Sequence, residues 1–368
     1  MSLWKNKIWI LGGEGLDSQY DRIRYNDIWS ADVTTSHLPT FKLELESAPW
    51  SARAYHQTVS FTKSDNNKSL WIFGGAAPSC TNFPCGDVWS SQDAVNWKKH
   101  PVVDTRWEGR YAHSAVAYGG MVFVFGGIGT DSFGDIVLYA DVWVTTDPSQ
   151  NWSKVVKSLT PSSTCKSYGC GAWIGQEFLN VYDEKDNAQI CAIGGAYEAN
   201  NFSSDVVCAS SSDPQNATAW RILTSRPGWS GRVFHEVVSL GSTNGTLLMG
   251  GSLWSEQWLA GNIWSQWNDA DCPSPTKCTS NPEYVPKNME GQRDMWLWPA
   301  QPSSSSRNDL FQWIRIWDVP WDERAGHAAV AANGRVYITA GSDGNHLYSD
   351  VWCYGCDDSP SPSPTPPP

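Results

Sequence analysis

The sequence has little of what marks nucleic-acid-binding and membrane-spanning proteins. No cluster of Lys and Arg occurs, and the formal net charge is −12. A phosphate backbone needs a positively charged partner surface, so we expect no nucleic-acid partner. No apolar run approaches the roughly 18–20 residues that cross a bilayer, so we expect no membrane span in this segment. The hydrophobic content of 40% still supplies a sizeable core, for one large all-β domain or two ordinary domains.

Motifs of common catalytic and cofactor sites are also missing. There is no Gly-x-Ser-x-Gly and no His-Glu-x-x-His, and no Gly-x-Gly-x-x-Gly precedes a helix. The acidic loops 13–27 and 129–141 could hold Ca²⁺ through several oxygens, but neither has the spacing of an EF-hand. The sequence therefore predicts no catalytic residue, no metal ligand and no cofactor, and it leaves open whether the protein is an enzyme.

Cysteine is abundant, and the ten residues fall in couples. None of the couples has zinc-site spacing to a second couple or to His. An even number in small loops favours disulfides and an oxidising compartment, with reduced cysteines in the cytosol as the alternative. The predicted pairs are Cys80 with Cys85, Cys165 with Cys170, Cys191 with Cys208, Cys272 with Cys278, and Cys353 with Cys356.

Asn-x-Ser/Thr sequons support the same compartment. Each marks a potential N-glycan in a secreted protein, and they lie at Asn67, Asn151, Asn201, Asn216 and Asn244. The opening residues "MSLWKNKIWILGG" have no basic region followed by an apolar one, so they are not a signal peptide. We therefore expect a secreted protein whose native N-terminus carries its signal upstream, and a cytosolic location is the alternative.

A Trp-x-x-Arg-x-x-His pattern occurs four times. Its first copy is "APWSARAYHQTV" (48–59), and the gaps between the tryptophans fit a unit of about 60 residues with one degenerate copy, "YGCGAWIGQEF" (168–178). Such self-similarity indicates a repeat architecture. The anchor residues are Trp50, Arg53, His56, Trp107, Arg110, His113, Trp229, Arg232, His235, Trp321, Arg324 and His327.

Two further signals keep the same rhythm. Short apolar strands end in Gly-Gly at 8–13, 70–75, 122–127, 190–195 and 246–251, and at 336–341 Ala340 replaces the first Gly. Asp-hydrophobic-Trp occurs at 27–29, 87–89, 141–143 and 350–352, with Asp205-Val-Val in the fourth unit and 294–296 favoured over Asn262-Ile-Trp in the fifth. Each unit therefore predicts four short antiparallel strands, and long helical periodicity is nearly absent.

This combination resembles the kelch repeat, and the resemblance covers nearly all of residues 4–356. It implies an all-β, kelch-type β-propeller with four-stranded antiparallel blades over residues 1–356. We expect six blades, or seven if the missing N-terminus carries more strands, with unit one lacking its first strand and unit six its last. The departures are the degenerate fourth unit and a long insertion at about 252–293 in the fifth.

The resemblance also implies a structural role for the repeated anchors, because a catalytic His rarely needs four copies. The Trp side chains would close each blade against the next, and the Arg side chains would lie over aromatic faces. The His side chains would begin the inner strands and hydrogen-bond loop backbone. The Gly pairs would let the chain leave a crowded strand end, including at positive φ.

The insertion offers the clearest candidate for ligand binding. It contains Trp254, Trp258, Trp264 and Trp267, whose rings could stack on sugars while nearby amides and carboxylates bind hydroxyl groups. Packing of the insertion onto the propeller is the alternative. After Cys356 the chain becomes "DDSPSPSPTPPP" (357–368), a polyproline tail or linker similar to those of plant and green-algal surface glycoproteins.

Three hypotheses of function follow. The first is an extracellular binding, adhesion or assembly module for glycans or for surface or wall proteins. The second is a secreted carbohydrate-active enzyme, because the resemblance includes copper oxidases of sugars and sialic-acid isomerases, although no copper ligand or other catalytic set can be placed on this chain. The third is a cytosolic kelch scaffold, which predicts free thiols and no glycans.

Overall fold

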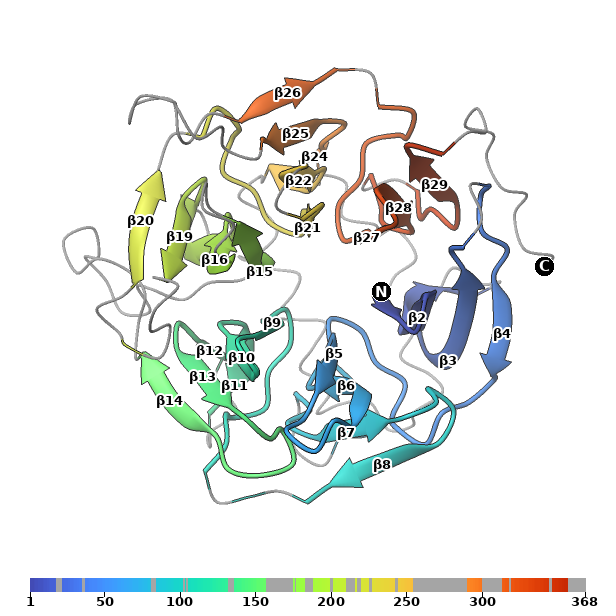
Figure 1. The fold of residues 1–368 in the computed structure, drawn as a ribbon, viewed down its shortest axis with the longest axis vertical. Helices are drawn as coiled ribbons and strands as arrows, with labels where there is room; N and C mark the ends of the chain where they lie inside the picture. The colour runs from blue at the N-terminus through green and yellow to red at the C-terminus, as the bar shows by residue number, and fades with distance from the viewer. Residues whose placement is uncertain are drawn as a thin grey trace.

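A computed structural model describes most of the chain, and its regular structure in the described residues consists of β-strands. Six antiparallel sheets stand around a common axis like the blades of a propeller (Figure 1). The described residues are 1–17, 22–34, 37–80, 84–101, 103, 105–131, 136–156, 175, 177–182, 188–198, 201–209, 216, 220–224, 227–241, 244–253, 290–299, 313–317, 319–343 and 346–356.

The first three blades each have four strands, which follow one another from the inside of the ring outward. Blade 1 contains β1 (Ser2–Trp4), β2 (Lys7–Leu16), β3 (Arg22–Asp32) and β4 (Lys42–Leu45). Blade 2 contains β5 (Gln57–Thr62), β6 (Lys68–Phe73), β7 (Val88–Ser91) and β8 (Trp97–His100). Blade 3 contains β9 (Ser114–Tyr118), β10 (Met121–Phe125), β13 (Val142–Thr145) and β14 (Ser153–Val156).

The other three blades follow the same order. Blade 4 contains β15 (Glu177–Tyr182), β16 (Ala188–Ile193), β19 (Val206–Ala209) and β20 (Trp220–Thr224). Blade 5 contains β21 (Glu236–Ser239), β22 (Thr246–Met249), β25 (Met295–Trp298) and β26 (Ile314–Ile316). Blade 6 contains β27 (Ala328–Ala332), β28 (Arg335–Thr339) and β29 (Val351–Tyr354).

Three small ribbons extend the loops between the second and third strands of blades 3, 4 and 5. They are β11 (Ile128–Thr130) with β12 (Ile136–Leu138), β17 (Ala196–Glu198) with β18 (Asn201–Phe202), and β23 (Ser252–Leu253) with β24 (Glu290–Gly291). In blade 1 the same loop is an extension of β2 and β3 themselves, where Glu14 pairs with Arg24. The predicted insertion at about 252–293 thus leaves blade 5 through a paired ribbon.

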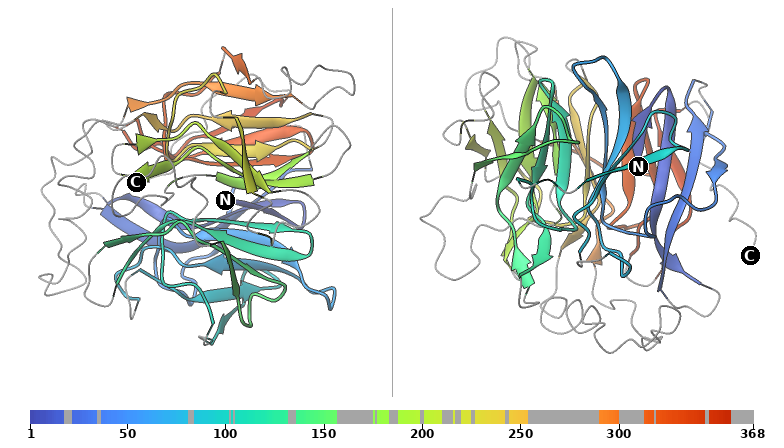
Figure 2. Two further views of the ribbon diagram at one scale, coloured as in Figure 1. Left: turned by 90° about the vertical axis from the view of Figure 1, so that its left-hand side faces the viewer. Right: turned by 90° about the horizontal axis from the view of Figure 1, so that it is seen from below.

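The ring closes through its innermost strands. β1, β5, β9, β15, β21 and β27 contact one another in this order, and β27 contacts β1. The views in Figure 2 show the sheets side by side around the axis. The prediction of six blades is therefore confirmed.

The prediction that unit one lacks its first strand is wrong. Residues Ser2–Trp4 form β1, the innermost strand of blade 1, and pair with β2. Lys5 and Asn6 connect them with φ values of 51° and 59°, which is the left-handed pair of a type I′ hairpin turn. This two-residue turn lets a strand of only three residues complete the blade. In blade 6, β29 is the outermost strand among the described residues.

Each space between neighbouring blades holds a separate hydrophobic core. Trp50 is buried between blades 1 and 2, Trp107 between blades 2 and 3, Trp229 between blades 4 and 5, and Trp321 between blades 5 and 6. Blades 3 and 4 enclose aliphatic and Phe side chains in place of an anchor Trp. The smallest core joins blades 6 and 1, with the four buried residues Ile8, Val33, Ala332 and Tyr337.

The antiparallel blades give the ring two different ends. We call one end the motif face, because it carries the Trp-x-x-Arg-x-x-His segments and the loops between second and third strands, including the three ribbons. We call the other end the hairpin face, because it carries the turns that join first to second and third to fourth strands. Sequence order and strand order fix this assignment.

Candidate functional site

The repeated Arg is a buried bridge inside its own blade. Arg53 is fully buried, and its Nη1 donates to the Gly74 carbonyl at 2.7 Å. The same guanidinium makes a two-pronged ion pair with Asp87, at 2.7 and 3.0 Å. The indole of Trp89 donates to the second carboxylate oxygen of Asp87 at 2.8 Å. The Gly-Gly end and the Asp-x-Trp triplet of one blade are thus tied together by the Arg.

The Arg–Asp ion pair recurs in blades 3, 5 and 6, with two prongs in blades 5 and 6, and the Arg–Asp oxygen distances lie between 2.6 and 3.0 Å. Burial opposes the charge on Asp141 and Asp350, but the Arg and its hydrogen bonds prevail and lower the pKa of both carboxyls. The bridges are Arg110–Asp141–Trp143, Arg232–Asp294–Trp296 and Arg324–Asp350–Trp352.

Sequence reasoning missed this ion pair and expected the Arg over an aromatic ring. The expected aromatic contact also occurs, because the guanidinium carbons of Arg110 and Arg324 lie 4.1 and 4.5 Å from the ring centroids of Tyr139 and Tyr348. The distances of Arg53, Arg110 and Arg232 from their anchor Trp rings are longer, 5.7–6.0 Å. The carboxylate is the closer partner. A signal was present in the sequence, since every unit with the Arg also has the Asp-x-Trp triplet.

Main-chain contacts of the anchor segment reach the preceding blade. The Arg53 carbonyl accepts from Gly13 at 2.9 Å, and the Arg110 carbonyl accepts from Gly75 at 2.9 Å. Arg232 and Arg324 accept in the same way from Gly195 and Gly251. Each anchor therefore holds its own blade by its side chain and the neighbouring blade by its backbone.

In blade 5 both glycines of the pair are required by close contacts. At Gly250 an added Cβ would lie 2.6 Å from the Arg324 carbonyl oxygen and 2.8 Å from the ring of His327 in the next blade. At Gly251 it would lie 2.7 Å from the Cβ of His235 in the same blade. Both glycines also have positive φ, 55° and 93°, where a side chain is strained.

In blade 6, Ala340 takes the place of the first Gly of the pair, and the neighbouring blade 1 explains why this is possible. The first glycine of a pair makes room for the Arg and His of the next blade, and no Trp-x-x-Arg-x-x-His segment lies at the start of blade 1 among the described residues. Ala340 keeps the left-handed φ of 63°, and the second glycine, Gly341, is retained against the Cβ of His327.

The four anchor His side chains lie at the start of the inner strands. His113, His235 and His327 are buried, and His56 is half-buried. The Nε2 of His235 lies 3.1 Å from the carbonyl of Ile193, the last residue of strand β16 in blade 4, so this backbone contact is to a strand end and not to the loop that was expected. Burial, and then the neighbouring Arg, lower the pKa of His56, His235 and His327 to about 3. These rings are neutral packing elements at ordinary pH.

The residue before each His forms part of a central ring on the motif face. Tyr55, Ala112, Gly175, Phe234 and Gly326 all have φ between 50° and 64°. Their backbones are linked in sequence, each amide donating to the carbonyl of the previous member at 2.9–3.3 Å. Left-handed backbone at a bulky residue costs on the order of 1–2 kcal/mol, and such strain concentrates at functional positions.

Three aromatic side chains meet at this central ring. Tyr55 lies 6.3 Å from Tyr111 and 6.1 Å from Phe234, measured between ring centroids. Tyr55 and Phe234 are half-buried and Tyr111 is buried, together with Leu138 of the blade 3 ribbon. Side chains from blades 2, 3 and 5 thus converge at the middle of the motif face, and we regard this cluster as the centre of the candidate site.

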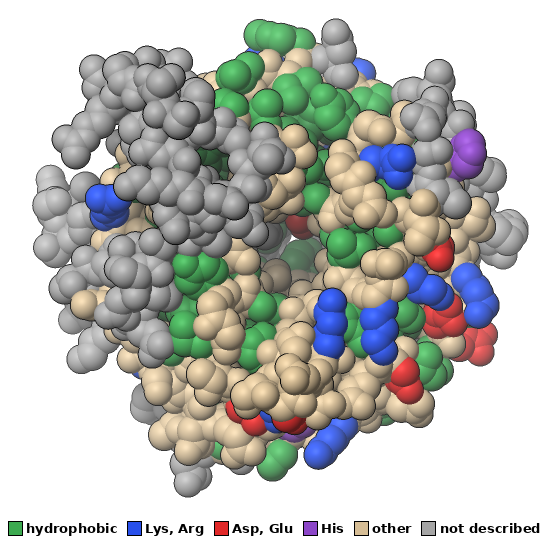
Figure 3. Space-filling model, in the orientation of Figure 1, with side chains coloured by type: hydrophobic (Ala, Val, Ile, Leu, Met, Phe, Trp, Pro, Cys, Tyr) green, Lys and Arg blue, Asp and Glu red, His purple; other side chains and the backbone are tan. Residues whose placement is uncertain are grey.

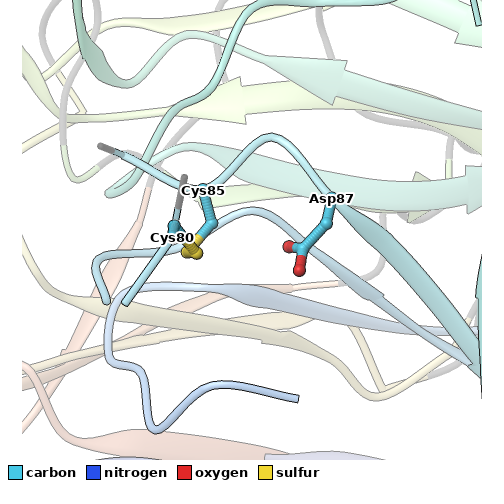
Figure 4. Close-up of side chains that lie close together, drawn as sticks. All are labelled: Cys80, Cys85 and Asp87. Atoms are coloured by element: carbon cyan, nitrogen blue, oxygen red, sulfur yellow. A yellow bond between two sulfur atoms is a disulfide. The ribbon is translucent and has the colours of Figure 1, made fainter. Parts of the chain in front are cut away.

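Space-filling and close-up views show two further features. The face of the propeller in Figure 3 is hollowed at its centre, and the innermost strands surround the axis. Figure 4 shows Cys80, Cys85 and Asp87 close together in the blade 2 loop, the one grouping of potential metal ligands among the described residues. It does not fit a metal site, because both sulfurs are joined in a disulfide and thiolates are required, while Asp87 is held by Arg53.

Three of the five predicted disulfides lie within the described residues, and all three form. They join Cys80 to Cys85, Cys191 to Cys208, and Cys353 to Cys356. Cys191 faces Cys208 directly across β16 and β19. The pairing of neighbouring cysteines is therefore confirmed for these six residues.

The other two predicted disulfides lie outside the described residues. Neither the pair of Cys165 and Cys170 nor the pair of Cys272 and Cys278 falls within them, so both bonds stay predictions. The same holds for the candidate sugar-binding residues of the insertion, which are Trp254, Trp258, Trp264 and Trp267. The sequon asparagines Asn67, Asn151, Asn216 and Asn244 are exposed, and Asn201 lies in β18.

Comparison with known proteins agrees with this geometry. A family model described as "KLHDC2/KLHL20/DRC7 Kelch-repeats domain" matches residues 1–251, and a second, "Kelch motif", matches residues 323–357. No curated protein matches the chain. Within the described part of the chain, we find no helix of the length and apolarity that a membrane crossing requires. Kelch repeats indicate a protein-interaction propeller with protein partners, and the chain belongs to the kelch-repeat family.

Proposed function

We propose that this protein is an extracellular binding module that holds a surface or wall protein on its motif face. The observation that carries the proposal is the aromatic cluster of Tyr55, Tyr111 and Phe234 on the strained central ring. Tyr and Phe are enriched at the centres of protein interfaces. Blades fix the positions of these side chains, and loops supply the contacts with the partner.

Exposed apolar side chains occur on other loops of the same face. Ile23 and Tyr25 extend from blade 1, Ile136 from the blade 3 ribbon and Leu347 from blade 6, each 38–48% exposed. Trp317, at the end of β26, is 72% exposed, and the guanidinium of Arg315 lies 4.0 Å from its ring. Trp, Tyr and Arg are the residue types that most often dominate binding energy, so Trp317 is a candidate outer contact.

Charge on the motif face favours a basic partner. Its exposed acidic side chains come from several loops and outnumber the exposed basic ones described there, which include Arg293 and the Arg315 that stacks on Trp317. The negative electrostatic potential of the acidic side chains speeds association with a positively charged surface, and this effect weakens as salt is added. The acidic residues are Asp17, Glu108, Asp131, Asp322 and Glu323.

An extracellular location is supported by the cysteines and the sequons. Three disulfides join all six cysteines of the described residues, and four sequon asparagines are exposed. Disulfides persist in oxidising compartments. Intact mass of native protein, before and after reduction and glycosidase treatment, tests this part directly. Ten alkylatable thiols and no glycan would support a cytosolic scaffold instead.

A pair of photo-crosslinking variants tests the binding face. Benzoylphenylalanine is placed at Ile136 on the motif face or at Val95 on the hairpin face, two positions of similar exposure, 41% and 37%. With surface proteins from the source cells, we expect a discrete adduct from the Ile136 variant that unlabelled protein competes away and that Trp317→Ala weakens. Adducts of equal intensity from both variants would contradict the proposal.

The same protein on an array of wall and surface oligosaccharides tests the glycan alternative. Binding to a defined sugar that is lost on deletion of 254–289 would locate recognition in the Trp-rich insertion and not on the central ring. Turnover of an arrayed sugar would support a carbohydrate-active enzyme. No sugar binding together with the Ile136 adduct is the result that we expect.

A further inference from the structure

The sequons are distributed unevenly between the two faces of the propeller. Asn67 lies in the turn between β5 and β6, and Asn244 in the turn between β21 and β22. Asn151 lies between β13 and β14, and Asn216 between β19 and β20. All four connections belong to the hairpin face, and all four side chains are exposed. Asn201, in the blade 4 ribbon, is the one sequon of the motif face.

The four asparagines also follow one another around the ring. Blades 2, 3, 4 and 5 each supply one of them, at a turn or at the connection to the outer strand. Asn67 shows the local geometry, because its side-chain amide donates to the exposed Asp65 of the same turn at 2.8 Å. An exposed side chain in a polar turn is accessible to the transferring enzyme, and a bulky sugar is accommodated at such a surface position.

We propose that N-linked oligosaccharides at Asn67, Asn151, Asn216 and Asn244 cover the hairpin face of blades 2–5. In the reaction the Asn amide nitrogen attacks the anomeric carbon of a polyprenyl-diphosphate-linked oligosaccharide. A C–N bond forms, the C–O bond to the diphosphate breaks, and the nitrogen loses one proton. The inference rests on the proposed function for the compartment, and it goes further by assigning the sugar-coated face and leaving the motif face to the partner.

The chain contains a matched control for this chemistry. Asn96 and Asn151 both lie in the connection between the third and fourth strands of a blade, and each is exposed and followed by Trp. Asn151 has Ser153 two residues later, whereas Asn96 has Lys98. Asn96 therefore matches Asn151 in placement but is not a sequon, and Lys98→Ser would make it one.

The experiment secretes the full chain from a eukaryotic cell behind an added signal peptide. Glycosidase treatment in heavy-oxygen water converts each glycosylated Asn to a labelled Asp, which peptide mapping locates. We expect at least three of the four hairpin-face sites to be labelled in most molecules and Asn96 to be unlabelled. Lys98→Ser should add label at Asn96, and a variant with all four Asn→Gln should lose the mass of the corresponding glycans.

Two outcomes would overturn the inference: two or more of the four sites empty in secreted, folded protein, or label confined to Asn201. Failure of the proposed function has a different signature. Native protein with free thiols and no glycans would place the chain in another compartment, while the acceptor sites would still be labelled in the secreting host.

Discussion

The side-chain amide of Asn333 donates a hydrogen bond of 2.9 Å to the carbonyl oxygen of Val33. Three hundred residues separate the two, and the bond joins the β27–β28 turn of blade 6 to blade 1. It lies beside the smallest of the interblade cores. Among the described residues no Trp-x-x-Arg-x-x-His segment crosses this seam, so single contacts such as this one have more weight here than at the four seams that such a segment crosses.

Asn333→Gly should lower the free energy of unfolding by about 1 kcal/mol, the usual value of one hydrogen bond. Asn333 has a φ of 52°, and Gly keeps this conformation without strain. Asn333→Ala should cost about 1 kcal/mol more, because Ala is strained there. Urea unfolding followed by Trp fluorescence measures both. Equal stability of Asn333→Gly and wild type would show that the bond contributes nothing to closure.

Exchanging Gly and Ala at equivalent positions should have opposite consequences in two blades. Gly250→Ala should destabilise the protein by more than about 2 kcal/mol, since its Cβ would overlap the Arg324 carbonyl and the His327 ring. Ala340→Gly should change stability by less than about 1 kcal/mol, because the next blade has no anchor to accommodate. Thermal melts of the two variants provide the comparison. A larger loss for Ala340→Gly would mean that Ala340 makes stabilising contacts of its own.

Breaking a buried Arg–Asp bridge should be far more costly than breaking an exposed ion pair. Asp294→Asn leaves the guanidinium of Arg232 buried without a counter-charge, which typically costs about 3–5 kcal/mol. Glu44→Gln, which removes the more exposed pairs with Lys42 and Lys7, should cost less than about 1 kcal/mol. Denaturant midpoints measure both. Similar losses would mean that Arg232 recovers solvent or another partner.

The buried His side chains should make the protein sensitive to acid. Burial lowers the pKa of His327 to about 3, whereas in the unfolded chain the pKa is about 6.5. Between these values the unfolded state binds one more proton, so stability falls as the pH decreases, by up to about 1.4 kcal/mol per pH unit for each such group. In urea unfolding curves recorded from pH 6.5 to 4, His327→Gln should therefore lose less stability than wild type, because it has one titrating group fewer.

Comparison with wild type cancels the effect of other groups, including Glu236, whose pKa burial raises to about 7. Gln is a suitable replacement because Gln176 follows Gly175 in the degenerate unit, as His follows the central-ring residue elsewhere. Parallel pH curves for the two proteins would mean that His327 is already charged, or accessible, in the folded state.

Much of the propeller could be predicted because its signals recur in phase. Six blades could be predicted from the Gly pairs, the anchor segments and the Asp-x-Trp triplets. The choice of Asp294-Met-Trp over Asn262-Ile-Trp was correct, since Asp294 pairs with Arg232. The Arg–Asp pairs were not foreseen, because partners 26 to 62 residues apart meet only after the blade folds. Strand β1 was missed because three residues carry too little periodicity, and a tight turn at Lys5 and Asn6 forms it.

The candidate site was less predictable than the fold. Tyr55, Tyr111 and Phe234 stand between Arg and His at positions that differ from copy to copy, so the repeat pattern hides them. Their convergence depends on the left-handed backbone of the central ring. This backbone conformation cannot be inferred from the pattern of side chains in the sequence. The Trp residues of the insertion were predicted to bind a ligand because several of them occur close together in the sequence, and they lie outside the described residues.

The links of the central ring use only peptide groups, passing from Tyr55 through Ala112, Gly175 and Phe234 to Gly326. Equivalent positions of the ring already carry a phenol, a methyl group, a phenyl group and two bare hydrogens, and the backbone hydrogen bonds between them are the same. Evolution can therefore exchange what the propeller displays at its centre while the scaffold beneath stays the same, and a new specificity could arise there by single substitutions.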